Sequence, residues 1–111
     1  MLEQDLKQKL QAGELAADNG TIIRALALVG KDYQYAQLRR LQLALSGNLQ
    51  RSGMCSAVNY LADSGYLAVR TVEDHKPSSV SDQPLEDLEV KLTPLGTQLQ
   101  RGLVKDPLVD L

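Results

Sequence analysis

The chain has 111 residues, of which 43% are hydrophobic and 23% are charged, so we expect one compact domain with its own core. A single Cys and a single His exclude an internal disulfide framework and a metal centre built from these residues. The longest apolar stretch is too short to span a bilayer, and the first ten residues have mixed charge and no apolar signal core. The composition predicts a soluble, cytoplasmic protein without a cofactor.

The net charge of −2 hides an uneven distribution along the chain. Residues 20–72 carry six basic and two acidic side chains, whereas residues 1–19 and residues 73–111 are each net negative. Only the middle of the chain is therefore expected to face a polyanion such as nucleic acid.

Leucine spacing predicts an amphipathic helix at the N-terminus, ending at about residue 17. Leu2, Leu6 and Leu10 recur every four residues and so lie near one helix face. Gly13 predicts a break in this helix, because glycine costs roughly 1 kcal/mol relative to alanine inside a helix. The leucines either pair with a second copy of the chain or fold back onto the chain's own core, and we expect the homodimer.

Three further helices are predicted before the helical spacing of apolar residues gives way to a strand pattern. Polar residues 18–21 offer caps for a second helical run ending at Gly30, with Ile22, Ile23, Leu26 and Val29 as its buried stripe. Residues 35–45 and 51–64 form the next two, separated by a turn at 46–48. Met54, Val58, Leu61 and Ala62 make the inner face of the second of these helices. A short turn between two helices fits a helix-turn-helix.

Apolar and polar residues alternate in residues 66–72 and again in residues 88–92, as in strands with one buried face. The two segments predict an antiparallel hairpin. The polar residues 73–85 between the strands are expected to form a long exposed loop. Thr93 and Pro94 are a strong helix start, and Leu95, Leu99 and Leu103 would line this last short helix. Residues 105–111 form a tail.

This order of elements is that of a winged helix, a mainly α fold with a small β-hairpin in the α+β class. The segments LADSGYLAVR and LEVKLTPLGTQLQRG resemble the third-helix exit, wing and closing helix of winged-helix regulators, through Leu61, Gly65, Leu67, Leu92, Thr93, Gly96 and Leu99. More narrowly, the chain is similar to small winged-helix proteins encoded in Mu-like prophages. The resemblance runs from about Asn19 to Pro107, and the first 18 residues lie outside it. We therefore expect an N-terminal helix (1–18), a winged-helix domain (19–104) and a C-terminal tail (105–111).

The resemblance implies a DNA-binding transcriptional regulator or accessory factor of phage type. Ser52, Ser56 and Asn59 fall on the outer face of the 51–64 helix and would face the major groove, unless they only solvate that face. The expected phosphate contacts are Arg39, Arg40 and Arg51, with a wing contact from Arg70, His75 or Lys76.

The alternative is a winged-helix module that binds a protein and not DNA. The wing tip is rich in acidic residues, and the 51–64 helix carries few basic ones. Convergence of Arg39, Arg40, Arg51 and Arg70 would favour DNA, whereas dispersal or pairing with carboxylates would favour the protein module. Cys55 is expected to be a small buried residue, and without a catalytic motif we expect no enzymatic activity.

Overall fold

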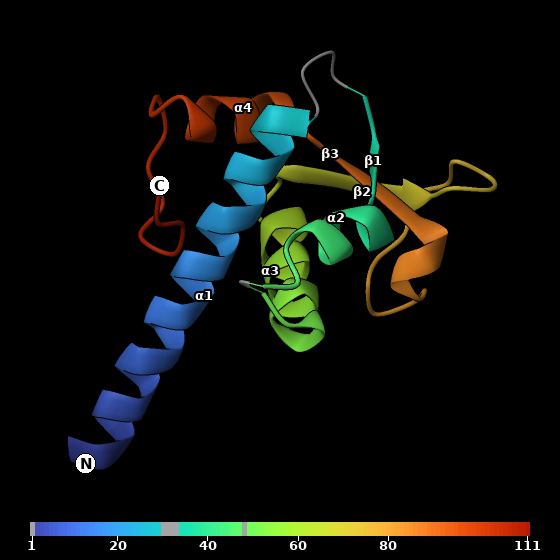
Figure 1. Cartoon of the computed structure of the whole chain (residues 1–111). Coiled ribbons are helices and arrows are strands. Elements are labelled where there is room, and N and C mark those ends of the chain that lie inside the picture. The colour runs from blue at the N-terminus through green and yellow to red at the C-terminus, as the bar shows by residue number, and fades with distance from the viewer. Residues whose placement is uncertain (1, 30–33, 48) are drawn as a thin grey trace.

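The computed structural model describes residues 2–29, 34–47 and 49–111, and it describes the side chains of this set from Glu3 onward. The element order is α1 (Leu2–Val29), β1 (Ala36–Gln37), α2 (Leu38–Ala44), α3 (Arg51–Asp63), β2 (Leu67–Thr71), a 3-10 turn η1 (Leu85–Asp87), β3 (Leu88–Leu92) and α4 (Pro94–Gln100). Figure 1 shows this mixed α+β arrangement, which confirms the predicted class. Gly30, where the second helical run was expected to end, Asn48 of the expected 46–48 turn, and the Leu2 side chain lie outside this description.

The predicted hairpin is present as part of a three-stranded antiparallel sheet with the order β1-β3-β2. Leu67 pairs with Leu92 and Val69 with Val90, so the alternating aliphatic residues share the inner face. Strand β1, where Ala36 pairs with Val90, was not predicted. A strand of two residues is too short to show an alternating hydrophobic pattern in the sequence. The helix that follows it begins at Leu38 and not at the predicted residue 35.

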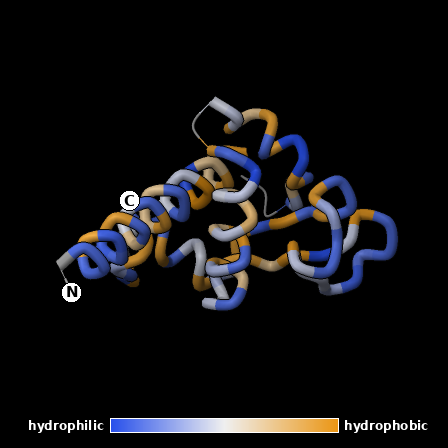
Figure 2. The backbone as a smooth tube through the Cα atoms, turned by 90° about the horizontal axis from the view of Figure 1, so that it is seen from below, coloured by the Kyte–Doolittle hydropathy of each residue, from blue (hydrophilic) through white to orange (hydrophobic). Residues whose placement is uncertain are grey.

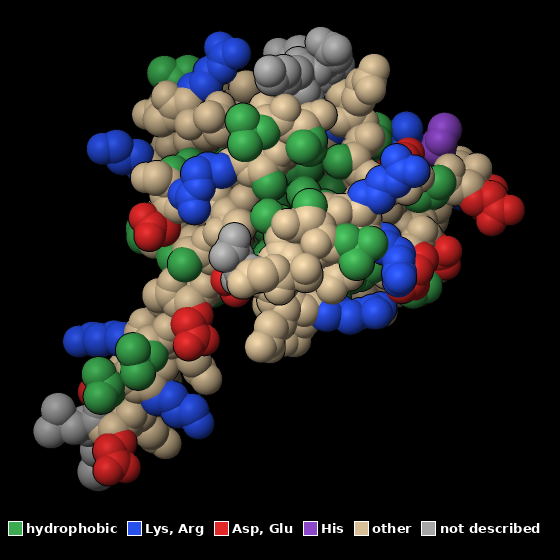
Figure 3. Space-filling view, in the orientation of Figure 1, with side chains coloured by type: hydrophobic (Ala, Val, Ile, Leu, Met, Phe, Trp, Pro, Cys, Tyr) green, Lys and Arg blue, Asp and Glu red, His purple; other side chains and the backbone are tan. Residues whose placement is uncertain are grey.

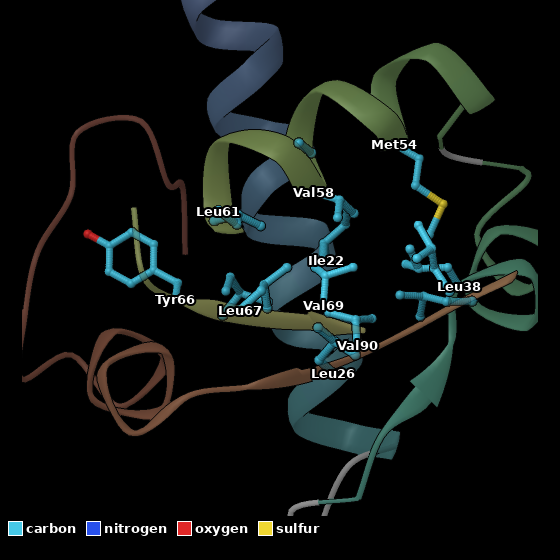
Figure 4. Packing of buried hydrophobic residues seen from close by; sticks show 14 of the residues in the cluster. Ile22, Leu26, Leu38, Met54, Val58, Leu61, Tyr66, Leu67, Val69 and Val90 are labelled. Carbon is cyan, nitrogen blue, oxygen red and sulfur yellow. The ribbon is translucent and has the colours of Figure 1, made fainter. Parts of the chain in front are cut away.

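The core lies between α1, α3 and the inner face of the sheet (Figure 4). The predicted inner face of α3 is confirmed for its largest members, because Met54, Val58 and Leu61 are fully buried. Val29 was wrongly placed in the core. It is the last residue of α1 and is 63% exposed, although it lies only about 20° around the helix from the fully buried Ile22, so its exposure follows from its place at the helix end and not from the helix face.

Helix α1 is continuous, so the predicted break at Gly13 and the predicted cap at residues 18–21 are both wrong. The reason is tertiary. Asn19 is fully buried and its Nδ2 donates to the carbonyl oxygen of Leu108 at 2.7 Å. A Cβ atom at Gly20 would overlap the carbonyl oxygen of Asp110. The Asn19-Gly20 pair lets the C-terminal residues pack closely against α1, at the place where the sequence predicted the start of a second helix.

Residues 105–111, here called the C-terminal strap, pack against α1 and the end of α3. The Asp110 amide donates to the carbonyl oxygen of Ala16 at 2.9 Å, and Val109 is buried. The Asp106 carboxylate accepts hydrogen bonds from the Tyr60 and Tyr66 hydroxyls, both at 2.9 Å to Oδ2. The strap thus holds the first and third helices together.

The L-T-x-x-G segment connects the end of α3 to the start of α4. Thr93 Oγ1 accepts from the Gly96 amide at 3.0 Å, which confirms the predicted cap, and it donates to the Gly65 carbonyl oxygen at 2.6 Å. Gly65 has a φ of 85° and terminates α3. Of the predicted α4 stripe only Leu99 is buried. Leu103 lies beyond the end of the helix and is 75% exposed.

The loop between β2 and β3 doubles back along the outer edge of β2 before it reaches β3. Pro77 forms a bridge with Arg70, and the Ser78 amide donates to the Val69 carbonyl oxygen at 3.1 Å. Leu85, in η1, is buried. The expectation of a wholly exposed loop over residues 73–85 is therefore wrong, because this segment covers a sheet edge that would otherwise be open.

The N-terminal half of α1 projects from the domain as an arm, defined here as residues 3–14 (Figure 1). All its residues are exposed, and hydrophobic and hydrophilic positions alternate along it (Figure 2). No helix in the described ranges 2–29, 34–47 and 49–111 is long and apolar enough to cross a membrane.

Candidate nucleic-acid interface

Two of the predicted phosphate-binding arginines meet at one carboxylate oxygen. Arg39 lies in α2 and Arg51 is the first residue of α3. Their guanidinium nitrogens lie 3.3 Å and 3.7 Å from Oε1 of Glu86, in η1. Both arginine side chains are more than half exposed, and Glu86 is 40% exposed. The three side chains form a solvent-facing cluster with one positive charge in excess, here called the Arg39–Arg51 cluster.

Arg40 follows Arg39 in α2 and is also exposed, so it adds a further positive charge to this end of the domain. In the space-filling view, basic side chains lie next to acidic ones on the side that holds α2 and the end of the β2–β3 hairpin, and other basic side chains lie on the opposite side and on the N-terminal part of α1 (Figure 3). This side of the domain is therefore basic but partly neutralised.

Ser52 and Ser56 are exposed on the outer face of α3, as predicted. They line a cleft of about 320 Å³ whose other wall is α1, including Glu14 and Asp18. A Cβ atom at Gly53 would lie 2.9 Å from Oδ2 of Asp18, which shows how closely the two helices approach. Burial, and then the neighbouring Glu14 carboxylate, raise the pKa of Asp18 above its ordinary value. The polar stripe of α3 thus borders an acidic helix face.

Asn59 continues the stripe, but it is half-buried and lines a different cleft. This cleft, of about 410 Å³, lies between α3, β2 and residues 75–80 of the loop. Asp63, Arg70 and His75 also line it. The structure therefore places Asn59 in a cleft shared with the wing and separate from the cleft lined by Ser52 and Ser56.

Arg70 is held on β2 by partners of its own. Its Nε donates to Oε1 of Glu89 at 2.6 Å, and its guanidinium lies 3.6 Å from the centroid of the Tyr35 ring. Lys91 approaches the same ring at 4.9 Å. Because the Arg70 side chain is only 28% exposed and Glu89 is nearly buried, this pair stabilises the sheet and presents little free charge.

The wing tip carries the remaining candidates, Lys76 and His75, and both are exposed. The backbone of Lys76 is fixed by Thr71, whose amide donates to the Lys76 carbonyl oxygen at 2.9 Å. His75 has a φ of 55°, and its Nε2 lies 3.7 Å from Oε1 of Glu89. The tip is a tight turn that also displays Glu73 and Asp74.

Sequence reasoning missed the acidic partners of the arginines. Glu89 lies directly opposite Arg70 in the β2–β3 register, so pairing the two predicted strands would have revealed it. Glu86 and Asp18 gave no such signal, because they come from segments distant in sequence from Arg51 and Ser52. Cys55 is half-buried against the core, close to its expected place.

Comparisons of the chain with protein-family models, with curated proteins and with solved structures gave no match.

Proposed function

We propose that the chain is a winged-helix protein of phage type, a regulator or accessory factor that binds duplex DNA through phosphate contacts. Helices α2 and α3 are joined by a turn and followed by the β2–β3 hairpin, and the short strand β1, which precedes α2, pairs with β3. This arrangement favours the winged helix as the description of the α+β fold. Fold alone does not establish function, so the proposal depends on the arginines.

The observation that carries the proposal is the convergence of Arg39 and Arg51 on a single oxygen of Glu86. Arginines from α2 and from the first residue of α3 lie where a helix-turn-helix borders the DNA backbone. An exposed ion pair is worth only about 0–1 kcal/mol, so a phosphate can take the place of Glu86. Arg40 supplies a third cation beside them.

The same face also limits how closely DNA can approach. Glu14 and Asp18 border the Ser52–Ser56 stripe, and their negative charge opposes insertion of α3 into the major groove. We therefore expect backbone binding that is weak, tolerant of sequence and strongly dependent on salt.

A second candidate function, a winged-helix module that binds a protein, is favoured by one specific observation. Arg39, Arg51 and Arg70 are each paired with a carboxylate, and pairing was the condition set for this alternative. In this function the acidic wall of the α1–α3 cleft would receive a basic segment of the partner.

Fluorescence anisotropy with a labelled mixed-sequence duplex, at several salt concentrations, separates the two functions. For DNA binding, the Arg39→Ala/Arg51→Ala variant should bind more weakly, and its log–log salt slope should fall by about two phosphate contacts. Arg101→Ala, an exposed charge at the end of α4, is the matched control and should retain the wild-type slope. Absence of wild-type binding at low salt would reject DNA binding, and equal losses in both variants would reject the Arg39–Arg51 cluster as the DNA contact.

A further inference from the structure

The projecting arm carries an apolar stripe that its own domain leaves uncovered. Leu6 is 60% exposed and Leu10 is 61% exposed. Gly13 and Ala17 continue the stripe on the same side, and both are exposed. At about 100° per residue these four positions fall within an arc of about 60°. Figure 3 shows the arm standing clear of the domain, with charges of both signs around it.

This stripe points away from the core. The buried positions of α1 (Asn19, Ile22, Ile23 and Leu26) are centred about 160° around the helix from it. The alternative, in which the leucines fold back onto the chain's own core, therefore finds no support in the exposure of Leu6 and Leu10. The arm has a free face of its own, about as long as the part of α1 that packs on the domain.

We propose that this face binds the same face of a second copy of the chain, with the two α1 helices antiparallel. The order of side-chain sizes carries the inference: two large residues, Leu6 and Leu10, precede two small ones, Gly13 and Ala17. Reversing one copy sets Leu10 against Gly13 of the partner subunit, and Leu6 against Ala17 of the partner subunit. No atom lies within 4 Å of a Cβ built at Gly13, so that position can receive a leucine.

The charges beside the stripe match in the same register. Lys7 and Glu14 flank it on one side, with opposite signs, seven residues apart. In the reversed copy Lys7 lies next to Glu14 of the partner subunit, and the two-fold axis repeats the pair. A parallel pair would oppose Gly13 to Gly13 and Ala17 to Ala17, which leaves gaps between the helices. A two-fold interface must be self-complementary, and this stripe is so only when reversed.

Sedimentation velocity over a micromolar concentration series tests the dimer in the full chain. The weight-average mass should rise from 12.1 kDa towards twice that value. Leu6→Gln/Leu10→Gln should remain at the monomer mass, with an unchanged far-UV spectrum of the domain, since both leucines are exposed in the monomer. Leu28→Gln is the matched control: Leu28 is 71% exposed on the same helix but lies beyond the proposed overlap, so it should associate like the wild type.

Charge reversal tests the orientation. Lys7→Glu and Glu14→Lys should each weaken the dimer, and the double variant should restore it, because the pair is then reversed at both symmetry-related places. A wild-type chain that stays monomeric, or a dimer indifferent to Leu6→Gln/Leu10→Gln, overturns the proposal. A leucine-dependent dimer that the double reversal fails to restore overturns the antiparallel arrangement.

Discussion

Arg70 and Glu89 face each other across the β2–β3 pair, with Arg70 Nε 2.6 Å from Glu89 Oε1. The side chains are 28% and 12% exposed, so water screens them little. Tyr35 covers the guanidinium from the other side. An arginine held in this way stabilises the sheet and is a poorer phosphate ligand than Arg39 or Arg51, which keep more than half of their surface in solvent.

Arg70→Ala should therefore lower the free energy of unfolding by roughly 1–3 kcal/mol, because it leaves a nearly buried carboxylate without its donor. Urea denaturation monitored by circular dichroism measures the loss. Arg40→Ala removes an exposed arginine and should change stability by less than about 0.5 kcal/mol. Equal stability of these two variants would contradict the structural role of Arg70.

Glu86→Gln should strengthen DNA binding, because it removes the carboxylate that competes with phosphate for Arg39 and Arg51. The gain should not exceed about fivefold, since an exposed ion pair is worth at most about 1 kcal/mol. Anisotropy at low salt measures it. Asp87→Asn deletes a neighbouring exposed charge outside the Arg39–Arg51 cluster and serves as the control for net charge. An equal gain from Asp87→Asn would show that only net charge matters.

Periodic and capping signals in the sequence were sufficient for much of the fold. The α3 inner face, the β2–β3 hairpin and the Thr93 cap each depend on residues close together in the chain, and all three are present. Strand β1 is too short to carry a period. Asn19 and Gly20 have the composition of a turn, yet they lie in mid-helix because the C-terminal strap packs there.

The candidate site was less predictable for a related reason. Its arginines come from the net positive middle of the chain, but Glu86 and Glu89 come from the net negative part that follows. Summing charge by segment treats these parts as separate, whereas folding brings them into contact. Only the Arg70–Glu89 pair follows from local pattern, through the hairpin register.

Gly20→Ala should destabilise the protein by about 1–3 kcal/mol, because a methyl group there overlaps the Asp110 carbonyl oxygen and must displace the strap. Thermal and urea unfolding measure the change. Gly13→Ala is the matched substitution in the same helix, with no atom within 4 Å of the added methyl group. It should raise helix content and leave the domain at least as stable. Similar losses in both variants would show that displacement of the strap is not the cause.

The strap should make stability depend on pH at both ends of the scale, through Asp106 and the tyrosines that donate to it. Burial raises the pKa of Tyr66 to about 12, helped by its hydrogen bond to Asp106, so its contribution is complete below pH 10.0 and is lost as pH rises towards 12. Burial alone would raise the pKa of Asp106, but hydrogen bonds from the Leu108 amide and the hydroxyls of Tyr66 and Tyr60 outweigh it and lower that pKa from 3.8.

The contribution of Asp106 is therefore present above pH 3.8 and is lost as pH falls through its lower folded-state pKa. Melting temperatures across the pH range should show Asp106→Asn losing less stability on acidification than the wild type. Tyr66→Phe should lose less between pH 10.0 and about 12. Asp82→Asn, in the exposed loop, should follow the wild-type acid profile. If the melting temperatures of Asp106→Asn and the wild type fall equally on acidification, the Asp106 carboxylate is not the cause of the pH dependence of stability.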